Sequence, residues 1–285
     1  MSSILEKLFS LNGRTAVVTG GTRGIGQAMA VSLAEAGSDI ILIQVSVAPL
    51  RWTTIAHRCL FLTPQQRDES NTETKKQIEA ISRTATVYTA DLSNQAQVEG
   101  LTQRILADGH DVSILVTCAG IQRRHPAHRF PMGDWDEVLQ VNLKTVWTLC
   151  RDLGAYMLTR PPNPATGHRG SIINVASLVS FQGGITVPAY AAAKGGIAQL
   201  TKALSNEWAG QGVNVNAVAP GYVATDMNEA LMGDPGRAAG ILARIPAGRW
   251  GTPEDFKGAT VFLAGAGSLY VSGELLTVDG GWMGR

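Results

Sequence analysis

Short apolar runs that alternate with helical segments constrain the fold of this chain more than any other feature of its sequence. Runs such as Ile40–Ile43 and Ile114–Val116 contain no polar residue. Continuous apolar runs of this kind are typical of strands that are buried on both faces of a parallel sheet. The alternation therefore predicts repeated strand–helix units and an α/β fold, in which a doubly wound parallel sheet carries helices on both faces.

The chain is expected to form one domain with about seven strands. The expected strands are Thr15–Thr19, Asp39–Gln44, Thr86–Ala90, Ser113–Thr117, Ser171–Val175, Val213–Val218 and Leu275–Val278. The expected helices are Gly24–Ala36, Thr72–Arg83, Gln95–Asp108, Trp135–Arg160 and Tyr190–Ala209. A length of 285 residues is ordinary for one doubly wound domain, so we assign residues 1–285 to a single domain.

Charge, hydropathy and cysteine usage exclude several classes of protein. A formal net charge of +1 gives no reason to expect a nucleic acid or an acidic membrane as partner. No apolar stretch reaches the roughly 18 residues of a membrane helix, and the first residues show no signal peptide. Three widely spaced cysteines form no disulfide framework, and the five histidines have no metal-ligand spacing. We expect a cytoplasmic protein with reduced thiols, no metal and a small-molecule partner.

One segment, Val45–Gln66, does not fit the strand–helix pattern. It is apolar and aromatic without helical or strand periodicity, and it follows the second strand where a connection of about 2–6 residues is usual. One interpretation is an insertion at residues 45–66. The other is a translated, unspliced intron, because its first residues, Val-Ser, can be encoded by a splice-donor sequence. Its removal would join Gln44 to Arg67 at a continuous strand-to-turn junction.

A glycine-rich turn, Thr19–Gly26, follows the first expected strand and opens the first expected helix. Glycine at these points permits a tight turn and lets backbone N–H groups approach a pyrophosphate at the helix N-terminus. The place of the turn between strand and helix favours a dinucleotide over a simple tight turn, and predicts a Rossmann-type, NAD(P)-binding domain. The candidate cofactor residues in it are Gly20, Thr22, Arg23, Gly24, Ile25 and Gly26.

The ends of the second and third strands are expected to meet the adenosine half of the cofactor. An acidic residue at the end of the second strand favours NAD, whereas a basic residue nearby favours NADP. This chain has Gln44 there, and Arg23 in the glycine-rich turn can reach a 2′-phosphate. The sequence therefore favours NADP but leaves NAD open. Asp91 and Leu92, after the third strand, are candidates for contact with the adenine edge.

Tyr190, Lys194 and Ser177 carry the chemistry that the sequence predicts. Tyr190 and Lys194 are four residues apart and therefore lie on one face of a helix. Reduction of a ketone needs a proton donor, and a neighbouring ammonium lowers the pKa of tyrosine from about 10, which suits it to acid–base work. Ser177, just after the fifth expected strand, can polarise the carbonyl oxygen. The three residues indicate interconversion of a secondary alcohol and a ketone.

These motifs together resemble the short-chain dehydrogenase/reductase family, and the resemblance runs over nearly the whole chain. It implies that Asn142, in the helix expected at Trp135–Arg160, holds a proton-relay water near Lys194. It also implies cofactor contacts for Tyr190 and Lys194, and for a further set of residues, namely Ala119, Gly120, Pro220, Gly221, Val223 and Thr225. A homotetramer or homodimer is expected by the same resemblance.

The family's NNAG motif reads Thr117-Cys118-Ala119-Gly120 in this chain. The second asparagine of that motif normally ties the central strand to neighbouring backbone. Its replacement by Cys118 is therefore expected to reduce stability rather than to abolish the chemistry.

Within the family, three segments are similar to dehydrogenases of sugar acids such as 2-deoxy-D-gluconate and 2-keto-3-deoxygluconate. They are Leu178–Gly184, Val187–Tyr190 and Arg244–Gly251. Arg124, one of a pair with Arg123, is the candidate for binding a substrate carboxylate, and Gln182 for binding hydroxyl groups. Two alternatives stay open, namely a 3-oxoacyl-thioester (acyl-carrier-protein) reductase and a non-catalytic dinucleotide-binding scaffold.

Overall fold

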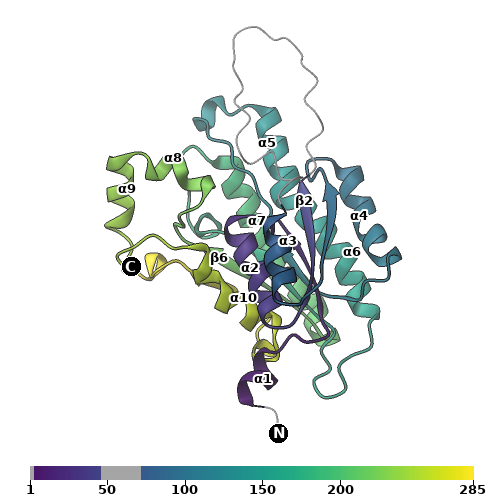
Figure 1. Cartoon of the computed structure of the whole chain (residues 1–285). Coiled ribbons are helices and arrows are strands. Elements are labelled where there is room, and N and C mark those ends of the chain that lie inside the picture. Colours follow the sequence, from purple (N-terminus) through teal and green to yellow (C-terminus); the bar gives the residue numbers. More distant parts are fainter. Residues whose placement is uncertain (1–2, 46–71) are drawn as a thin grey trace.

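The computed structural model describes residues 3–45 and 72–285, which form a seven-stranded parallel sheet flanked by helices (Figure 1). The strand order is β3-β2-β1-β4-β5-β6-β7. Their bounds are β1 Thr15–Thr19, β2 Asp39–Val45, β3 Ala85–Ala90, β4 Val112–Thr117, β5 Gly170–Val175, β6 Val213–Pro220 and β7 Leu275–Val278. The α/β fold and all seven expected strands are confirmed, with ends that differ by at most two residues. Of the segment expected as an insertion, residues 46–66 lie outside the described residues.

The strands are apolar because the sheet is covered on both faces. Every residue of β4 and of β5 is buried, and side chains such as Ile114, Leu115 and Ile172 are 0% exposed. Burial of a leucine or isoleucine side chain contributes about 1.5–3 kcal/mol, so these central strands carry much of the stability.

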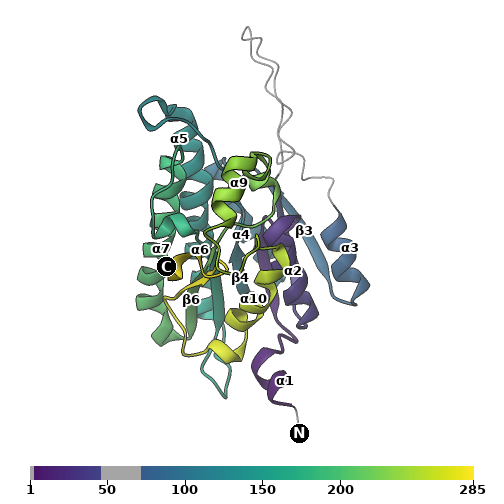
Figure 2. The ribbon, with the colours of Figure 1, turned by 90° about the vertical axis from the view of Figure 1, so that its left-hand side faces the viewer.

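Helices cover the sheet in two layers. The α-helices are α1 Ile4–Phe9, α2 Gly24–Glu35, α3 Glu73–Ala80, α4 Gln95–Ala107, α5 Met132–Leu139, α6 Thr145–Thr159, α7 Pro188–Trp208, α8 Glu229–Met232, α9 Pro235–Leu242 and α10 Lys257–Ala264. One apolar core lies under α4, α6 and α7, and the other lies under α2, α3 and α10. Figure 2 shows α7 on one side of the sheet and α2 and α3 on the other. No helix in the described ranges is long and apolar enough to cross a membrane.

The region expected as one helix at Trp135–Arg160 is helical, but it begins earlier and is not uniform. It consists of α5, a π-helical turn η3 (Gln140–Lys144) and α6. The sequence prediction also did not include α1, α8, α9 or α10. These helices span four to eight residues, which is too short for apolar periodicity to distinguish them from loops.

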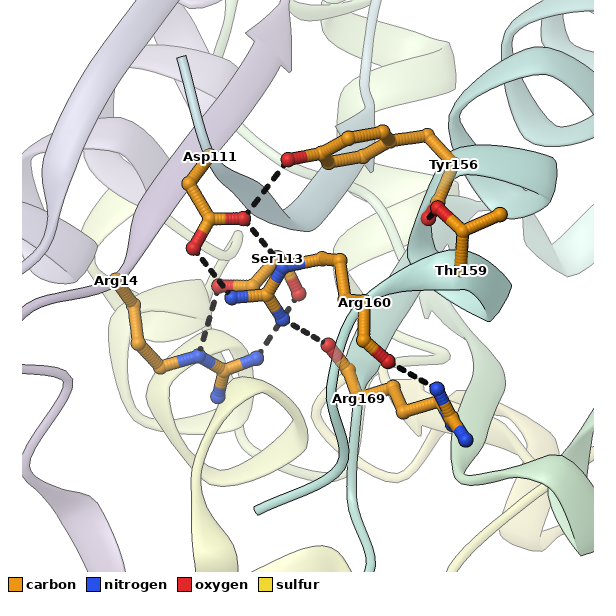
Figure 3. A network of polar contacts seen from close by, with 7 residues as sticks. All are labelled: Arg14, Asp111, Ser113, Tyr156, Thr159, Arg160 and Arg169. Atoms are coloured by element: carbon orange, nitrogen blue, oxygen red, sulfur yellow. Dashed lines mark hydrogen bonds and ion pairs between the residues drawn. The ribbon is translucent and has the colours of Figure 1, made fainter. Parts of the chain in front are cut away.

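A polar network closes the end of the sheet where the strands begin (Figure 3). Asp111, just before β4, accepts hydrogen bonds from Tyr156 Oη at 2.9 Å and from Arg160 Nε at 2.5 Å. Arg14, just before β1, donates from Nε to Ser113 Oγ at 3.1 Å and from Nη2 to Ser113 O at 2.9 Å. Desolvation and the nearby Arg160 charge lower the pKa of Arg14 to about 10. These polar groups bond to one another and hold the ends of the strands together, so we assign the network a structural role.

Candidate active site

A cleft of about 870 Å³ lies at the carboxyl ends of the strands. Ligands bind at this end in open parallel α/β sheets, because the loops that follow the strands converge there. Nearly all the residues that the sequence predicts line this cleft, namely Gly20, Thr22, Arg23, Gly24, Ile25, Gly26, Asp91, Leu92, Ala119, Gly120, Arg124, Ser177, Gln182, Tyr190, Lys194, Pro220, Gly221, Val223 and Thr225. Gln44 and Asn142 do not line it, and the side chain of Gln44 is buried.

The glycine-rich turn packs too tightly for side chains at two of its positions. Gly20 has a positive φ of 66°, and a Cβ there would lie 2.8 Å from the Cα of Ala119. A Cβ on Gly26 would lie 2.1 Å from the carbonyl oxygen of Gly20. The turn therefore holds bare backbone at the N-terminus of α2, beside the cleft. This cradle fits the pyrophosphate of a dinucleotide.

Two polar contacts involve predicted cofactor residues of the cleft, Asp91 and Arg23. Asp91 Oδ1 accepts hydrogen bonds from the backbone N–H of Ser93 at 2.9 Å and from its hydroxyl at 2.7 Å. Arg23 Nη1 lies 3.7 Å from Asp226 Oδ2, and both side chains are partly exposed. The pair joins the glycine-rich turn to the segment that follows β6. An exposed pair of this kind contributes only about 0–1 kcal/mol.

Asn142 lies in the π-helical turn η3, and its side chain is 0% exposed. Its Oδ1 accepts a hydrogen bond from the backbone N–H of Ile121 at 2.9 Å, and its Nδ2 donates to the carbonyl of Ile121 at 2.7 Å. Both polar ends of the side chain are therefore used to hold the segment that follows β4, which lines the cleft. A Cβ on Gly120 would lie 2.8 Å from Asn142 Oδ1, so this approach also requires glycine.

Lys194 is buried at the base of the cleft. Its side chain is 2% exposed, and Nζ donates a hydrogen bond to the carbonyl of Val175 at 2.6 Å. Nζ also lies 5.7 Å from the centre of the Tyr190 ring. Desolvation lowers the pKa of Lys194 to about 8, which leaves the ammonium form dominant at neutral pH. The cleft therefore holds a positive charge next to a phenol.

Tyr190 is half-buried and lies between Lys194 and Ser177. The sequence predicts a pKa below 10 for Tyr190, and this prediction is wrong: desolvation raises the pKa of Tyr190 to about 12, while a hydrogen bond with Ser177 and the charge of Arg124 act in the opposite direction. At neutral pH the phenol is therefore protonated and able to donate. Ser177 is held by its neighbours, because its backbone N–H donates to Ser180 Oγ at 3.3 Å and Ser180 Oγ donates to the carbonyl of Lys194 at 2.7 Å.

The two arginines after β4 have different surroundings. Arg123 Nη2 forms an ion pair with Glu137 Oε2 at 2.8 Å, so its charge is balanced within the protein. Arg124 also lines the cleft and has no hydrogen-bond or ion-pair partner among residues 3–45 and 72–285. Desolvation and the charge of Arg237 lower the pKa of Arg124. Two arginines that repel each other across one cleft are favourable surroundings for an anion.

An aromatic wall closes the far end of the cleft, and the sequence prediction did not include it. It consists of Tyr222, after β6, and Trp282, next to the C-terminus, with ring centres 4.7 Å apart. Arg244 lies over the Trp282 ring at 3.9 Å. No local sequence pattern predicts that Trp282 lies in the cleft, because its position depends on how the chain turns in the few residues after β7.

Cys118 lines the cleft as well, where the resemblance suggested a loosened strand. Other contacts tie this region together, because Thr19 Oγ1 accepts from the backbone N–H of Ala119 at 3.1 Å, and Thr117 Oγ1 donates to Asn174 Oδ1 at 2.8 Å. Desolvation raises the pKa of the Cys118 thiol to about 11, so it is protonated at neutral pH. The expected loss of stability stays a prediction.

Comparison with known proteins gives consistent matches over nearly the whole chain. The family model described as enoyl-(acyl carrier protein) reductase matches residues 20–283. A 2-dehydro-3-deoxy-D-gluconate 5-dehydrogenase of Pseudoalteromonas atlantica is 46% identical, over 99% of this chain and 100% of that protein. The enzyme with the same name from Escherichia coli is 43% identical, over 97% of this chain and 98% of that protein.

The chain is also similar to solved structures of sugar-acid dehydrogenases. A putative NAD(P)-dependent gluconate 5-dehydrogenase of Beutenbergia cavernae, with bound NADP, is 43% identical with a TM-score of 0.83, and the match covers 97% of this chain and 99% of that one. A gluconate 5-dehydrogenase of Burkholderia cenocepacia in complex with NADP and tartrate is 34% identical with a TM-score of 0.82, and the match covers 98% and 99% of the two chains.

Proposed function

Because this chain belongs to the short-chain dehydrogenase/reductase family, we propose that its cleft binds NAD(P) and a six-carbon sugar acid together and transfers a hydride between them. The enzyme is an NAD(P)-dependent oxidoreductase that interconverts a secondary alcohol and a ketone on a sugar acid. We propose C5 as the reacting carbon, because relatives at 33–46% identity are named for reactions at this position. The observation that carries this proposal is the group of Ser177, Tyr190 and Lys194 in the same cleft as Arg124, which has no hydrogen-bond or ion-pair partner within the described residues.

The roles of the catalytic residues follow from their surroundings. When bound, the nicotinamide supplies or accepts the hydride. Tyr190 donates its phenolic proton to the carbonyl oxygen of the substrate during reduction and removes the proton from the hydroxyl during oxidation. Lys194 keeps a positive charge beside the phenol and so stabilises tyrosinate. Ser177 hydrogen-bonds Tyr190 and polarises the substrate oxygen. Asn142 holds the backbone of Ile121 in place. We also propose that Asn142 helps to hold a proton-relay water near Lys194.

The cofactor is held by the residues that line the cleft on the side of β1. The glycine-rich turn fits the pyrophosphate because its glycines leave no room for side chains. Asp91, Leu92, Ala119 and Gly120 are proposed to contact the adenosine half, and Pro220, Gly221, Val223 and Thr225 the nicotinamide half. The enzyme uses NADP or NAD. We propose NADP as the preferred form, because Arg23 brings a positive charge to the glycine-rich turn and lines the same cleft.

Arg124 is proposed to bind the carboxylate of the sugar acid, with Arg237 on α9 contributing its charge. Replacing Arg124 with Gln is expected to raise the KM for the sugar acid by about 10- to 100-fold, because a hydrogen bond to a charged group contributes about 1.5–3 kcal/mol. The KM for NADP(H) should stay unchanged, since the two sites are separate. Steady-state kinetics with each substrate varied in turn measures both values.

Arg129→Gln is the matched control for this prediction. Arg129 follows on the same segment, is exposed and does not line the cleft, so its replacement should leave both KM values unchanged. An unchanged KM for the sugar acid in Arg124→Gln would show that the carboxylate binds elsewhere, and the substrate class would then lose its main support.

A 3-oxoacyl-thioester reductase is the second candidate, although the description of the matching family model names a different reaction, the reduction of an enoyl group on acyl carrier protein. The charges of Arg124 and Arg237 in the cleft oppose this reaction, because a long acyl chain needs an apolar groove. A non-catalytic scaffold is a poorer explanation, because the chain keeps Ser177, Tyr190 and Lys194 together in the cleft.

The assembly and location of the enzyme are proposed from the family resemblance alone. We propose a homotetramer or homodimer, with residues 278–281 at the end of β7 near the interface, and a cytoplasmic location. A small molecule is the substrate, and neither a nucleic acid nor a membrane is proposed as partner.

A further inference from the structure

The chain turns back on itself after β7 and brings Trp282 into the cleft. Gly280 and Gly281 have positive φ values of 65° and 90°, which reverse the chain direction. The Asp279 carboxylate then fixes the turn, because it accepts hydrogen bonds from the backbone N–H groups of Gly281 and Met283, both at 2.8 Å. Trp282 is only 4% exposed as a result, although it is the fourth residue from the end of the sequence.

The indole of Trp282 makes three specific contacts. Its ring packs against Tyr222 with ring centres 4.7 Å apart, and it lies under the guanidinium of Arg244 at 3.9 Å. Its Nε1–H donates a hydrogen bond to Oε1 of Gln182 at 3.3 Å. Gln182 comes from the segment between Ser177 and Tyr190, so this bond links the C-terminus to the catalytic loop.

The indole settles which way the Gln182 amide faces. An indole N–H can only donate, so the amide atom that it meets has to be the oxygen. The NH₂ group of Gln182 therefore faces away from Trp282, and it has no hydrogen-bond partner within the described part of the chain. Gln182 itself lines the cleft. The NH₂ group therefore offers its two N–H donors to the cleft, while the oxygen faces the indole.

We propose that Trp282 is a positioning residue for the substrate, because it fixes the Gln182 amide so that its NH₂ group donates to an oxygen of the sugar acid. The inference rests on the proposed function, since it places the sugar acid at this end of the cleft. The contact with Trp282 turns the NH₂ group of Gln182, and not its oxygen, away from the indole and toward the substrate. The substrate group that it meets is therefore an acceptor, namely a carboxylate, a carbonyl or a lone pair of a hydroxyl oxygen.

The Trp282→Phe variant tests this inference, because phenylalanine keeps an aromatic ring and loses the N–H donor. We expect the KM for the sugar acid to rise by about 2- to 12-fold, the range that corresponds to one net hydrogen bond. The kcat and the KM for NADP(H) should stay within about twofold, because the lost contact binds substrate and transition state alike. A general loss of packing would instead lower kcat and change both KM values.

Two further variants separate positioning from packing. Gln182→Leu alone should raise the same KM, and the double variant should match Gln182→Leu rather than show the product of the two effects. Trp250→Phe is the matched control, since Trp250 also packs against Tyr222, at 5.7 Å, but does not line the cleft. It should leave the KM unchanged. If the KM for the sugar acid in the double variant rose by the product of the two single-variant changes, the inference would be overturned.

A spectroscopic readout tests the contact without any substrate. In protein labelled with ¹⁵N-tryptophan, the indole N–H signal that disappears in Trp282→Phe should shift in Gln182→Leu. An unshifted signal would overturn the inference whatever the enzyme reduces. Turnover of the sugar acid by the unchanged enzyme tests the proposed function separately, so the two failures are distinguishable.

Discussion

Replacing Tyr190 with Phe is expected to lower kcat by about 10²- to 10⁴-fold, the range over which a positioned acid–base group contributes to catalysis. The variant keeps the aromatic ring and removes the phenol that lies next to Lys194 in the cleft. NADP(H) binding should change by less than about twofold, because the glycine-rich turn is untouched. Turnover is measured by nicotinamide absorbance, and cofactor binding by titration of cofactor fluorescence. We expect turnover to be lost and cofactor binding to be kept.

The pH dependence of the rate of the unchanged enzyme should reflect the protonation state of Tyr190. Desolvation raises the pKa of this phenol to about 12, so it is protonated across the neutral range. Ketone reduction needs the protonated form and should not fall between neutral and mildly alkaline pH. Alcohol oxidation needs tyrosinate, so its rate should rise with pH up to about pH 8, where Lys194 begins to lose the charge that stabilises tyrosinate. Residual activity of Tyr190→Phe should lack this rise.

Tyr270→Phe is the control for the tyrosine prediction, since the Tyr270 side chain is fully exposed and lies outside the cleft. Its rate and pH profile should match those of the unchanged enzyme. A Tyr190→Phe variant that retains more than about a tenth of kcat would contradict the assignment of Tyr190 as the proton donor.

Replacing Lys194 with Met is expected to remove activity and to raise stability at pH 7. The loss of the ammonium leaves tyrosinate without its neighbouring positive charge, so kcat should fall by at least about 10²-fold. Burial lowers the pKa of Lys194 from 10.5 to about 8, which means that the charged form is held in the folded protein at a cost. Its removal should increase the free energy of unfolding by on the order of 2 kcal/mol, after the lost bond to Val175 is counted.

The size of this stability effect changes with pH in a defined way. Between about pH 8 and pH 10.5 the unfolded chain holds the Lys194 proton and the folded chain does not, so this group makes the folded protein more stable as pH rises. Below about pH 8 both states hold the proton and the full cost applies. The advantage of Lys194→Met should therefore be largest near neutral pH and shrink through the alkaline range.

Thermal unfolding measured at several pH values checks this prediction. A gain on the order of 2 kcal/mol corresponds to a Tm about 4–8 °C higher at pH 7. Lys202→Met is the matched control, because Lys202 lies on the same helix α7 and is exposed. It should change neither Tm nor kcat. A Lys194→Met variant that unfolds at a lower temperature than the unchanged enzyme would show that the buried ammonium stabilises the fold.

The strands were predictable because a parallel sheet covered on both faces leaves an unbroken apolar run in the sequence. Ile40–Ile43 and Ile114–Val116 are examples, and both lie within strands of the sheet. The π-helical turn at Gln140–Lys144 was not predictable from periodicity. Its side-chain contact, Asn142 to Ile121, joins residues far apart in the sequence. Tertiary contacts of this kind leave no local pattern.

The site was predictable where its residues are close in the sequence. Tyr190 and Lys194 are one helical turn apart, and the glycine-rich turn is a single segment, so their patterns are visible. Arg124 and Arg123 are adjacent and look equivalent, and only the ion pair with Glu137 distinguishes them. Trp282 was missed because its position depends on the chain reversal at Gly280–Gly281. The insertion or intron at residues 45–66 stays a prediction.

The most direct test of the proposed reaction is the initial rate of nicotinamide absorbance change with 2-dehydro-3-deoxy-D-gluconate and either NADP⁺ or NAD⁺, set against reduction of a 3-oxoacyl thioester with NADPH. The account predicts turnover of the sugar acid, faster with NADP⁺ than with NAD⁺, and its loss in Tyr190→Phe. Reduction of the thioester without turnover of any sugar acid would contradict the account.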